Sequence, residues 1–134
     1  ARKVNAIREQ AMACLTRVNL AHRAEHITRE LSHGEHRHIE IAIALAAQAK
    51  VMLLDEPMAG LGIEENRAMV QLLQEIKGQS TIVLIEHDMD AVFALADRIS
   101  VLVYGHIIAT GTPDDIRNNK DVEAAYLGEE GAGH

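Results

Sequence analysis

VMLLDEP, residues 51–57, is the stretch that decides the fold of this 134-residue chain. An apolar run that ends in two carboxylates and a helix-breaking proline is typical of a buried parallel strand whose carboxyl end reaches a crevice. TIVLIEH, residues 81–87, repeats the pattern, and a helical pattern lies between the two at residues 64–77. The inward face of that helix is predicted to hold Met69, Leu72, Leu73 and Ile76. Alternation of strand, helix and strand predicts an α/β fold with parallel strands.

Toward the C-terminus the pattern becomes shorter. After a short helix that Asp88 caps, RISVLVYG (98–105) predicts a third strand, and the alternation in HIIATG (106–111) predicts an edge ribbon. TPDDIRNN (112–119) is a helix start, with Thr112 as cap and Pro113 at the first helical position. DVEAAYL (121–127) predicts a last helix, and residues 128–134 are expected to have no regular structure.

Toward the N-terminus two helices are predicted. Apolar residues at helical spacing give the first, from Val4 to Val18, and a polar connector follows to Glu30. Ser32 stands at the N-cap of the second, with Glu35 placed to complete a capping box. This second helix should reach about Gln48, with an inward stripe of Ile39, Ala42, Ile43 and Ala46.

Composition excludes several classes of protein. The chain is 48% hydrophobic and 25% charged, which suits one globular domain or a large piece of one. Its net charge of -7 repels a phosphate backbone, so we expect no nucleic-acid partner. Cys14 is the single cysteine, which precludes an internal disulfide and indicates a reducing compartment. No apolar run is long enough to span a bilayer and no signal peptide is present, so we expect a cytoplasmic chain without membrane insertion.

The two predicted parallel strands carry their chemistry at one edge. Open parallel sheets bind ligands beyond the carboxyl ends of their strands, and here those ends carry Asp55, Glu56 and His87. A carboxylate at a strand tip suits a Mg²⁺ ion, its neighbour could orient or deprotonate a water, and an imidazole could contact a phosphate. The structural alternatives are a solvated strand end and a capped core histidine.

Four motifs in order then resemble one family. LSHGE (31–35) resembles the signature motif of ATP-binding cassette (ABC) ATPases, VMLLDEP the Walker B strand, MAGLG (58–62) the D-loop and IEHD (85–88) the switch-histidine loop. The resemblance covers about residues 31–111. The closing GTPDDIRNNKDVEAAYLGE is similar to the ATPases of branched-chain amino acid importers. The chain is therefore identified as resembling the C-terminal part of an ABC nucleotide-binding domain.

That resemblance implies a partial P-loop NTPase core of the RecA-like ABC type. Residues 1–30 would end the helical subdomain, 31–111 would carry the four motifs, and 112–134 would form the C-terminal helices and tail. The cofactors implied are ATP and Mg²⁺, with Asp55 on the ion through water and Glu56 and His87 catalytic. The signature residues Ser32, His33, Gly34 and Glu35 would contact ATP on a partner subunit, and the D-loop residues Ala59, Gly60, Leu61 and Gly62 would line the dimer seam.

The implied assembly pairs two ATPase subunits, identical or not, with transmembrane permease subunits. The chain would lie in the cytoplasm, on the inner face of the membrane, and ATP hydrolysis would drive import of branched-chain amino acids. Two other functions stay open: a non-transport ABC ATPase, and a truncated module that dimerises without catalysis. For Ser32 alone, an ordinary helix cap is the simpler interpretation.

The sequence also departs from the family pattern. His36, His38 and Ile43 stand where signature helices commonly have glutamine, arginine and arginine, which predicts weaker polar ties of this helix to the catalytic core. No G-x-x-x-x-G-K-[ST] loop occurs in the sequence, so we expect the N-terminal half of the domain to be missing and no ATP hydrolysis by this chain alone. A slot between the strands near His87 and Arg98 would make the isolated chain marginally stable or aggregation-prone.

A metal site is the remaining alternative for the histidine-rich segment. His22, His26, His33, His36 and His38 crowd one stretch, and the first two have the i,i+4 spacing of a metal pair. No cysteine or obvious carboxylate completes a ligand set. A solvated polar face is the other interpretation.

Overall fold

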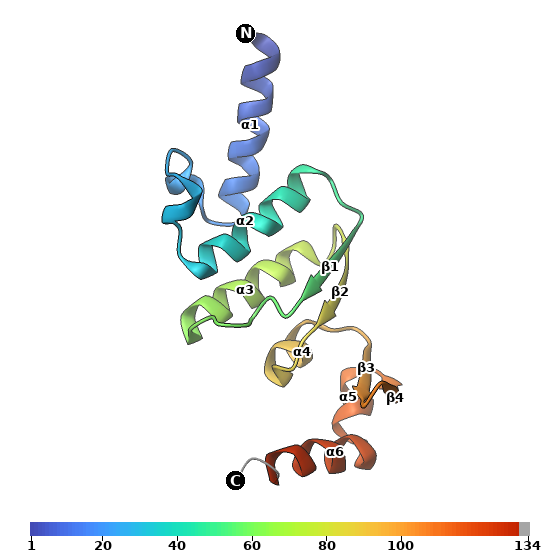
Figure 1. Cartoon of the computed structure of the whole chain (residues 1–134). Helices are drawn as coiled ribbons and strands as arrows, with labels where there is room; N and C mark the ends of the chain where they lie inside the picture. Colours follow the sequence, from blue (N-terminus) through green and yellow to red (C-terminus); the bar gives the residue numbers. More distant parts are fainter. Residues whose placement is uncertain (132–134) are drawn as a thin grey trace. The chain divides into compact units, whose positions relative to one another are not determined.

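The computed structural model describes residues 1–131, and their side chains through residue 126, in two compact units that divide after Asp88 (Figure 1). The first unit contains α1 (Arg2–Arg17), η1 (Ala21–Arg23), η2 (Thr28–Glu30), α2 (His33–Ala46), β1 (Val51–Asp55), α3 (Ile63–Ile76) and β2 (Thr81–Ile85). The second contains α4 (Met89–Leu95), β3 (Ile99–Val103), β4 (His106–Gly111), α5 (Pro113–Arg117) and α6 (Lys120–Gly131). Across these described residues, no helix combines the length and apolar character needed to cross a membrane.

The first unit is built on a parallel strand pair. β1 and β2 run in register from Val51 opposite Thr81 to Asp55 opposite Ile85, and α3 is the crossover that joins them. The inward face of α3 is fully buried, as the sequence predicted, at Met69, Leu72, Leu73 and Ile76. Met52 of β1 is buried as well. The predicted α/β fold with parallel strands is confirmed.

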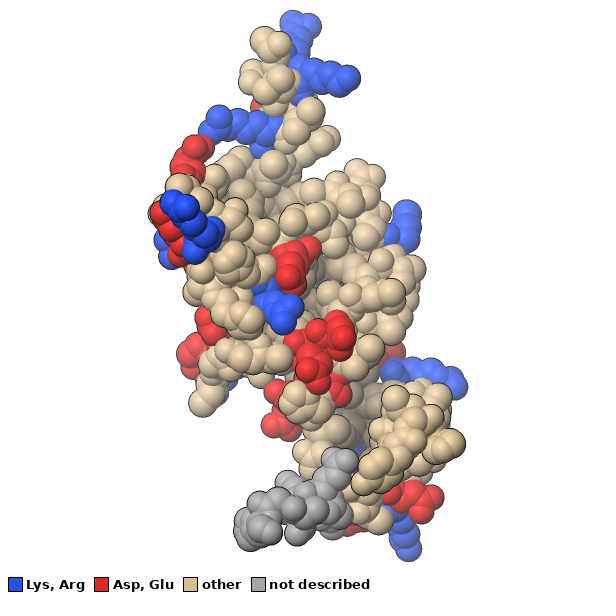
Figure 2. All heavy atoms as spheres, viewed as in Figure 1, with Lys and Arg blue, Asp and Glu red and all other residues tan. Residues whose placement is uncertain are grey.

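The other face of this strand pair is apolar and uncovered. Val51, Leu53, Val83 and Ile85 alternate along β1 and β2 onto one face, and all four are exposed, Leu53 by 77%. Figure 2 shows a broad area without charged side chains over this part of the molecule. A cavity of about 290 Å³ adjoins β1 and is bordered by α2 residues that include Ile41 and Ala44. Low stability of the isolated chain stays a prediction, and these faces are its physical basis.

Helix α2 is rotated relative to its predicted apolar stripe. Its buried residues are Gly34, Ile41 and Ala42, whereas Ile43 is 65% exposed and Ala46 is also exposed. The stripe was right at Ala42 and wrong at Ile43 and Ala46. The inward face includes Gly34, which lies against Glu65 of α3, and Ile43 is nine positions further along, on the opposite side of the helix. Positions 34 and 41 lie two turns apart, so they share that face.

The second unit is a hairpin packed on short helices. β3 and β4 pair antiparallel, as predicted for an edge ribbon, and turn through Tyr104 and Gly105, which both have positive φ (47° and 79°). Its core consists of Ile99, Ile116 and Val122 with partly buried neighbours. The expectation of an irregular tail from residue 128 was wrong as far as Gly131, because α6 continues to that residue. Residues 132–134 lie outside the described residues.

Candidate functional site

The ends of β1 and β2 bring Glu56 and His87 together. Because the strands are parallel neighbours, the residues that follow them emerge at one edge, and the Glu56 N–H donates to the Ile85 carbonyl over 2.8 Å. His87 Nδ1 lies 3.1 Å from Glu56 Oε1. The two side chains are 77% and 50% exposed, so water or a phosphate can reach the pair. An imidazole in contact with a carboxylate can hold or pass a proton at this edge.

Glu56 has an unusual backbone. Its φ of 47° lies in the left-handed region, which costs a non-glycine residue about 1–3 kcal/mol and is tolerated mostly where the surroundings require it. The turn follows directly on the last strand residue, Asp55, and precedes the buried Pro57. It redirects the chain at the residue whose carboxylate meets His87.

Asp55 ends β1 with an exposed side chain. Mg²⁺ usually keeps several waters and takes one or two protein carboxylates beside phosphate oxygens, and a single carboxylate at an open strand tip fits that need. Within the described part of the chain no three His, Cys, Asp or Glu side chains cluster as metal ligands. This holds for His22 and His26 as for the strand tips, so no described group resembles an all-protein metal cage.

Glu86 organises this edge, and sequence reasoning gave it no role. Its half-buried carboxylate accepts the backbone N–H groups of Met58 (2.9 Å), His87 (3.1 Å) and Asp88 (3.2 Å). One carboxylate thus ties the start of the D-loop to the segment that carries His87. The sequence feature that could have revealed this role is the position of Glu86, directly before His87 at a strand end. Backbone N–H groups there can donate hydrogen bonds to a carboxylate.

The segment that resembles the D-loop contacts the segment that resembles the signature motif within the same chain. His33 Nε2 lies 3.1 Å from the Ala59 carbonyl oxygen, and Gly60 has a φ of 75° with the His33 ring close against it. Leu61 is half-buried, and the Gly62 N–H donates to Glu65 Oε2 over 3.1 Å. His33 therefore links the two motifs, which the sequence alone did not indicate.

Ser32 begins α2 through the predicted capping box. Its exposed hydroxyl oxygen accepts the Glu35 N–H over 3.1 Å, and Glu35 Oε2 accepts the Ser32 N–H over 2.8 Å. Among the described residues the N–H groups of His33 and Gly34 have no acceptor. Free N–H groups at the positive end of a helix suit an anion.

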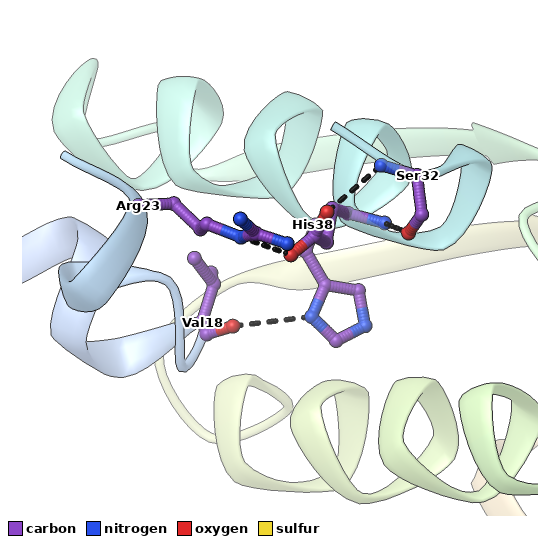
Figure 3. A network of polar contacts seen from close by, with 5 residues as sticks. Val18, Arg23, Ser32 and His38 are labelled. Carbon is purple, nitrogen blue, oxygen red and sulfur yellow. Dashed lines mark hydrogen bonds and ion pairs between the residues drawn. The ribbon is translucent and has the colours of Figure 1, made fainter. Parts of the chain in front are cut away.

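Arg23 is a second residue that sequence reasoning missed. From η1 its Nε donates to Glu35 Oε1 over 2.8 Å, with side chains 34% and 20% exposed (Figure 3). The hydrogen bond from the Ser32 backbone and that from Arg23 lower the pKa of Glu35 below its usual range. The carboxylate is thus anionic at neutral pH and held at both oxygens.

His38 stands where signature helices commonly have arginine, and it contacts a different segment of the chain. Its Nδ1 lies 3.1 Å from the Val18 carbonyl oxygen and joins α2 to the end of α1 (Figure 3). This contact is to the end of α1 and not to the strand tips, so weaker polar ties of α2 to the catalytic core stay a prediction. No hydrogen bond among the described residues joins Ser32 to Glu56 or His87, so the strand tips and the helix start form two separate parts of the candidate site.

Comparisons with known proteins agree with the motifs. A family model described as ABC transporter matches residues 2–59, and one described as branched-chain amino acid ATP-binding cassette transporter matches residues 106–132. The high-affinity branched-chain amino acid transport ATP-binding protein LivG of Escherichia coli is 42% identical over 123 residues, which are 90% of this chain and 48% of LivG. The lipopolysaccharide export system ATP-binding protein LptB of Haemophilus influenzae is 36% identical over 124 residues, 92% of this chain and 52% of LptB.

Solved structures agree as well. The crystal structure of the ADP conformation of an ATP-binding cassette of an ABC transporter is 29% identical, with a TM-score of 0.80 over 92% of this chain and 50% of that one. The chain thus spans about half the length of the relatives it matches. The resemblance predicted from the four motifs is confirmed. On these matches, the chain is similar to about half of the ATP-binding protein of an ABC transporter, with LivG among the similar proteins.

Proposed function

We propose that this chain supplies the signature, Walker B, D-loop and switch-histidine parts of an ATP-hydrolysing subunit of an importer for branched-chain amino acids. The observation that carries the proposal is the 3.1 Å contact between His87 Nδ1 and Glu56 Oε1 at adjacent parallel strand tips. Its support from relatives is the 42% identity with LivG and the match of residues 106–132. LptB, which is 36% identical, is named for export, so the direction of transport is tested below by measuring uptake.

In this proposal the strand tips act on the terminal phosphate of ATP. Glu56 orients the attacking water and accepts its proton, while His87 contacts the γ-phosphate and the water. Asp55 holds the water shell of Mg²⁺, which neutralises phosphate charge when bound. Glu86 fixes the backbone of both segments by its three hydrogen bonds, so that the two side chains meet.

The helix start of α2 acts on a second nucleotide. The Ser32 hydroxyl and the free N–H groups of His33 and Gly34 approach the phosphates of ATP bound by a partner subunit, across a seam along the D-loop. Residues 1–30 border the surface that meets the permease, on the cytoplasmic face of the membrane. Closure of the two subunits on ATP then drives the permease between its states.

The test is a LivG chimera, in which residues 1–134 replace the matching segment of Escherichia coli LivG. We expect Glu56→Gln to keep ATP binding while the hydrolysis rate falls about 10²- to 10⁴-fold, the usual contribution of a positioned base. The matched control is Glu64→Gln, because Glu64 is an exposed glutamate that pairs with Arg67 on the surface of α3. Equal rates in the chimera and its Glu56→Gln variant would remove Glu56 from the mechanism.

The substrate class is tested by uptake. The chimera should restore leucine uptake in Escherichia coli that lacks LivG, and its Glu56→Gln variant should not. If the chimera hydrolyses ATP without restoring uptake, the importer assignment fails while the ATPase assignment stands. A chimera that binds ATP without hydrolysing it supports the noncatalytic dimerisation module.

A further inference from the structure

Glu35 places a negative charge at the proposed phosphate-binding end of α2. Its carboxylate lies one helical turn from Ser32 and accepts that residue's N–H over 2.8 Å. A carboxylate there stabilises the helix, because it caps a free donor and faces the positive end of the dipole. The same negative charge repels an approaching phosphate. Phosphate binding at this helix start therefore requires a positive group that neutralises Glu35.

Arg23 meets that need in the structure. Its Nε donates to Glu35 Oε1 over 2.8 Å, the oxygen that the Ser32 N–H does not use. The ion pair is mostly shielded from water, with the Glu35 side chain only 20% exposed, so its charges are screened less than those of a surface pair. Figure 3 shows Arg23 reaching the helix start from the neighbouring segment, away from Ser32.

The arrangement leaves the donors on the other side of the helix start unoccupied. Ser32 Oγ uses a lone pair on the Glu35 N–H, so its hydroxyl hydrogen is free to donate. The N–H groups of His33 and Gly34 have no acceptor among residues 1–131. Gly34 is buried, with Glu65 Oε1 2.6 Å from where a Cβ would lie, so the backbone there is tightly held.

We propose that Arg23 is a positioning residue for this helix start: it neutralises Glu35 and holds its carboxylate in the capping box, so that Ser32, His33 and Gly34 can receive a phosphate group. This rests on the proposed function. Arg23 does not touch the nucleotide. It determines how strongly the helix start binds an anion.

The test uses the LivG chimera, unmodified or with substitutions in residues 1–134, and inorganic tripolyphosphate at constant ionic strength. Tripolyphosphate presents the phosphates without a base or ribose. Binding is followed by NMR through the amide shifts of Ser32, His33 and Gly34. Arg23→Gln removes the charge and keeps a donor of similar length, and Arg23→Lys keeps the charge.

We expect Arg23→Gln to weaken binding about three- to tenfold, as for a partly buried charge beside a helix terminus. Arg23→Lys should stay within about twofold of the unmodified chimera, because it restores the charge. Arg23→Gln/Glu35→Gln should bind as tightly as Glu35→Gln alone, because the carboxylate that Arg23 pairs with is then absent from both variants. A residue that only stabilised the fold would show no such rescue.

The matched control is Arg8→Gln. Arg8 also forms an ion pair with a glutamate, Glu25 at 2.7 Å, but both side chains are highly exposed, and the change in net charge is the same. It should leave binding within about twofold. If Arg8→Gln weakens binding as much as Arg23→Gln, the effect is one of net charge and the proposal is overturned.

Two further outcomes separate the proposals. If the unmodified chimera binds tripolyphosphate and Arg23→Gln binds equally well, the role of Arg23 fails and the phosphate role of Ser32 stands. Binding by the double variant as weak as that of Arg23→Gln also overturns the role of Arg23. If the unmodified chimera shows no shifts at Ser32, His33 and Gly34, both this proposal and the phosphate role of the helix start fail.

Discussion

Among the described residues, α2 and α5 begin with capping boxes whose cap residue carries a hydroxyl; the two boxes are alike in their hydrogen bonds and differ in what surrounds them. At α2, Ser32 and Glu35 exchange bonds of 3.1 and 2.8 Å; at α5, Thr112 and Asp115 exchange bonds of 3.2 and 2.9 Å. Both boxes lower the pKa of their carboxyl group, chiefly through the backbone N–H of the cap residue. The local device is therefore the same in both units.

The residues after each cap make the difference. Proline at the first position of α5 has no N–H, and Asp114 adds a negative charge at the second, so the start of this five-residue helix offers little to an anion. In α2 the same positions are His33 and Gly34, which keep their N–H groups free, and Arg23 neutralises the capping carboxylate. A capping box by itself starts a helix, and in our proposal these additions make the start of α2 suitable for phosphate.

The largest effect should come from removing each cap hydroxyl in the LivG chimera. Ser32→Ala and Thr112→Ala each cost about 1 kcal/mol of local helix stability. Hydrolysis should fall about 10²-fold for Ser32→Ala, as when a preorganised donor to transition-state charge is lost, and change less than about threefold for Thr112→Ala. Steady-state ATPase rates at saturating ATP measure both, and equal effects would make Ser32 a cap only.

A proline at the first position of α2, as in α5, should give the next largest effect. Proline is well tolerated at the first helical position, and Ser32 before it already has the extended backbone that proline requires (φ -66°, ψ 166°). His33→Pro should therefore keep α2 but remove one N–H donor, and lower hydrolysis about tenfold relative to His33→Ala. His33→Ala is the control, because it also removes the contact with Ala59. Matching rates in the two variants would exclude that N–H from the mechanism.

A smaller effect, on local helix stability, is expected when the glycine at each capping box is replaced by alanine. A Cβ at Gly111 would lie 2.8 Å from Asp115 Cβ, which cannot move without disturbing α5, whereas a Cβ at Gly34 would meet the flexible end of Glu65. Overpacking costs about 1–3 kcal/mol, and Gly111→Ala should exceed Gly34→Ala by about 1 kcal/mol. Amide hydrogen exchange of α2 and α5 reports each local stability. The reverse order would mean that Glu65 is held more rigidly than its contacts suggest.

The smallest effect concerns pH. Because both carboxyl pKa values are lowered on folding, each box contributes stability that is present above the unfolded pKa and lost as the pH falls through the folded pKa. The unfolded-state pKa is 4.5 for Glu35 and 3.8 for Asp115, so the loss of stability should begin as the pH falls below about these values. Glu35→Gln and Asp115→Asn should each flatten the fall in unfolding free energy between pH 6 and pH 3, measured by urea unfolding. If the unfolding free energy falls as steeply in both variants as in the unmodified chain, other titratable groups cause the fall.

Much of the first unit was predictable because its signals are local. Apolar runs with polar ends gave β1 and β2, and periodicity gave the buried face of α3. The capping box at Ser32 follows from residues three apart, so its hydrogen bonds were predicted too. The contact of Glu56 with His87 followed from parallel pairing, which places both strand ends at one edge.

What the sequence did not indicate depends on contacts between distant segments. Arg23 meets Glu35 across 12 positions, and Glu86 meets Met58 across 28, and no periodicity marks either pair. The inward face of α2 was misjudged at Ile43 and Ala46 for the same reason, since that face includes Gly34, which lies against the distant Glu65. Charged residues near a predicted helix start are the signal that could have revealed Arg23.

The central claim is that Glu56 and His87 work on one nucleotide while Ser32 of the same chain works on another. Its most direct test is the ATPase rate of a mixture of two LivG chimeras, one with Glu56→Gln and the other with Ser32→Ala. We expect each variant alone to be nearly inactive and the mixture to recover about a quarter of the unmodified rate, because half of randomly paired dimers are mixed and each keeps one intact site. A mixture as inactive as its two components would contradict the claim.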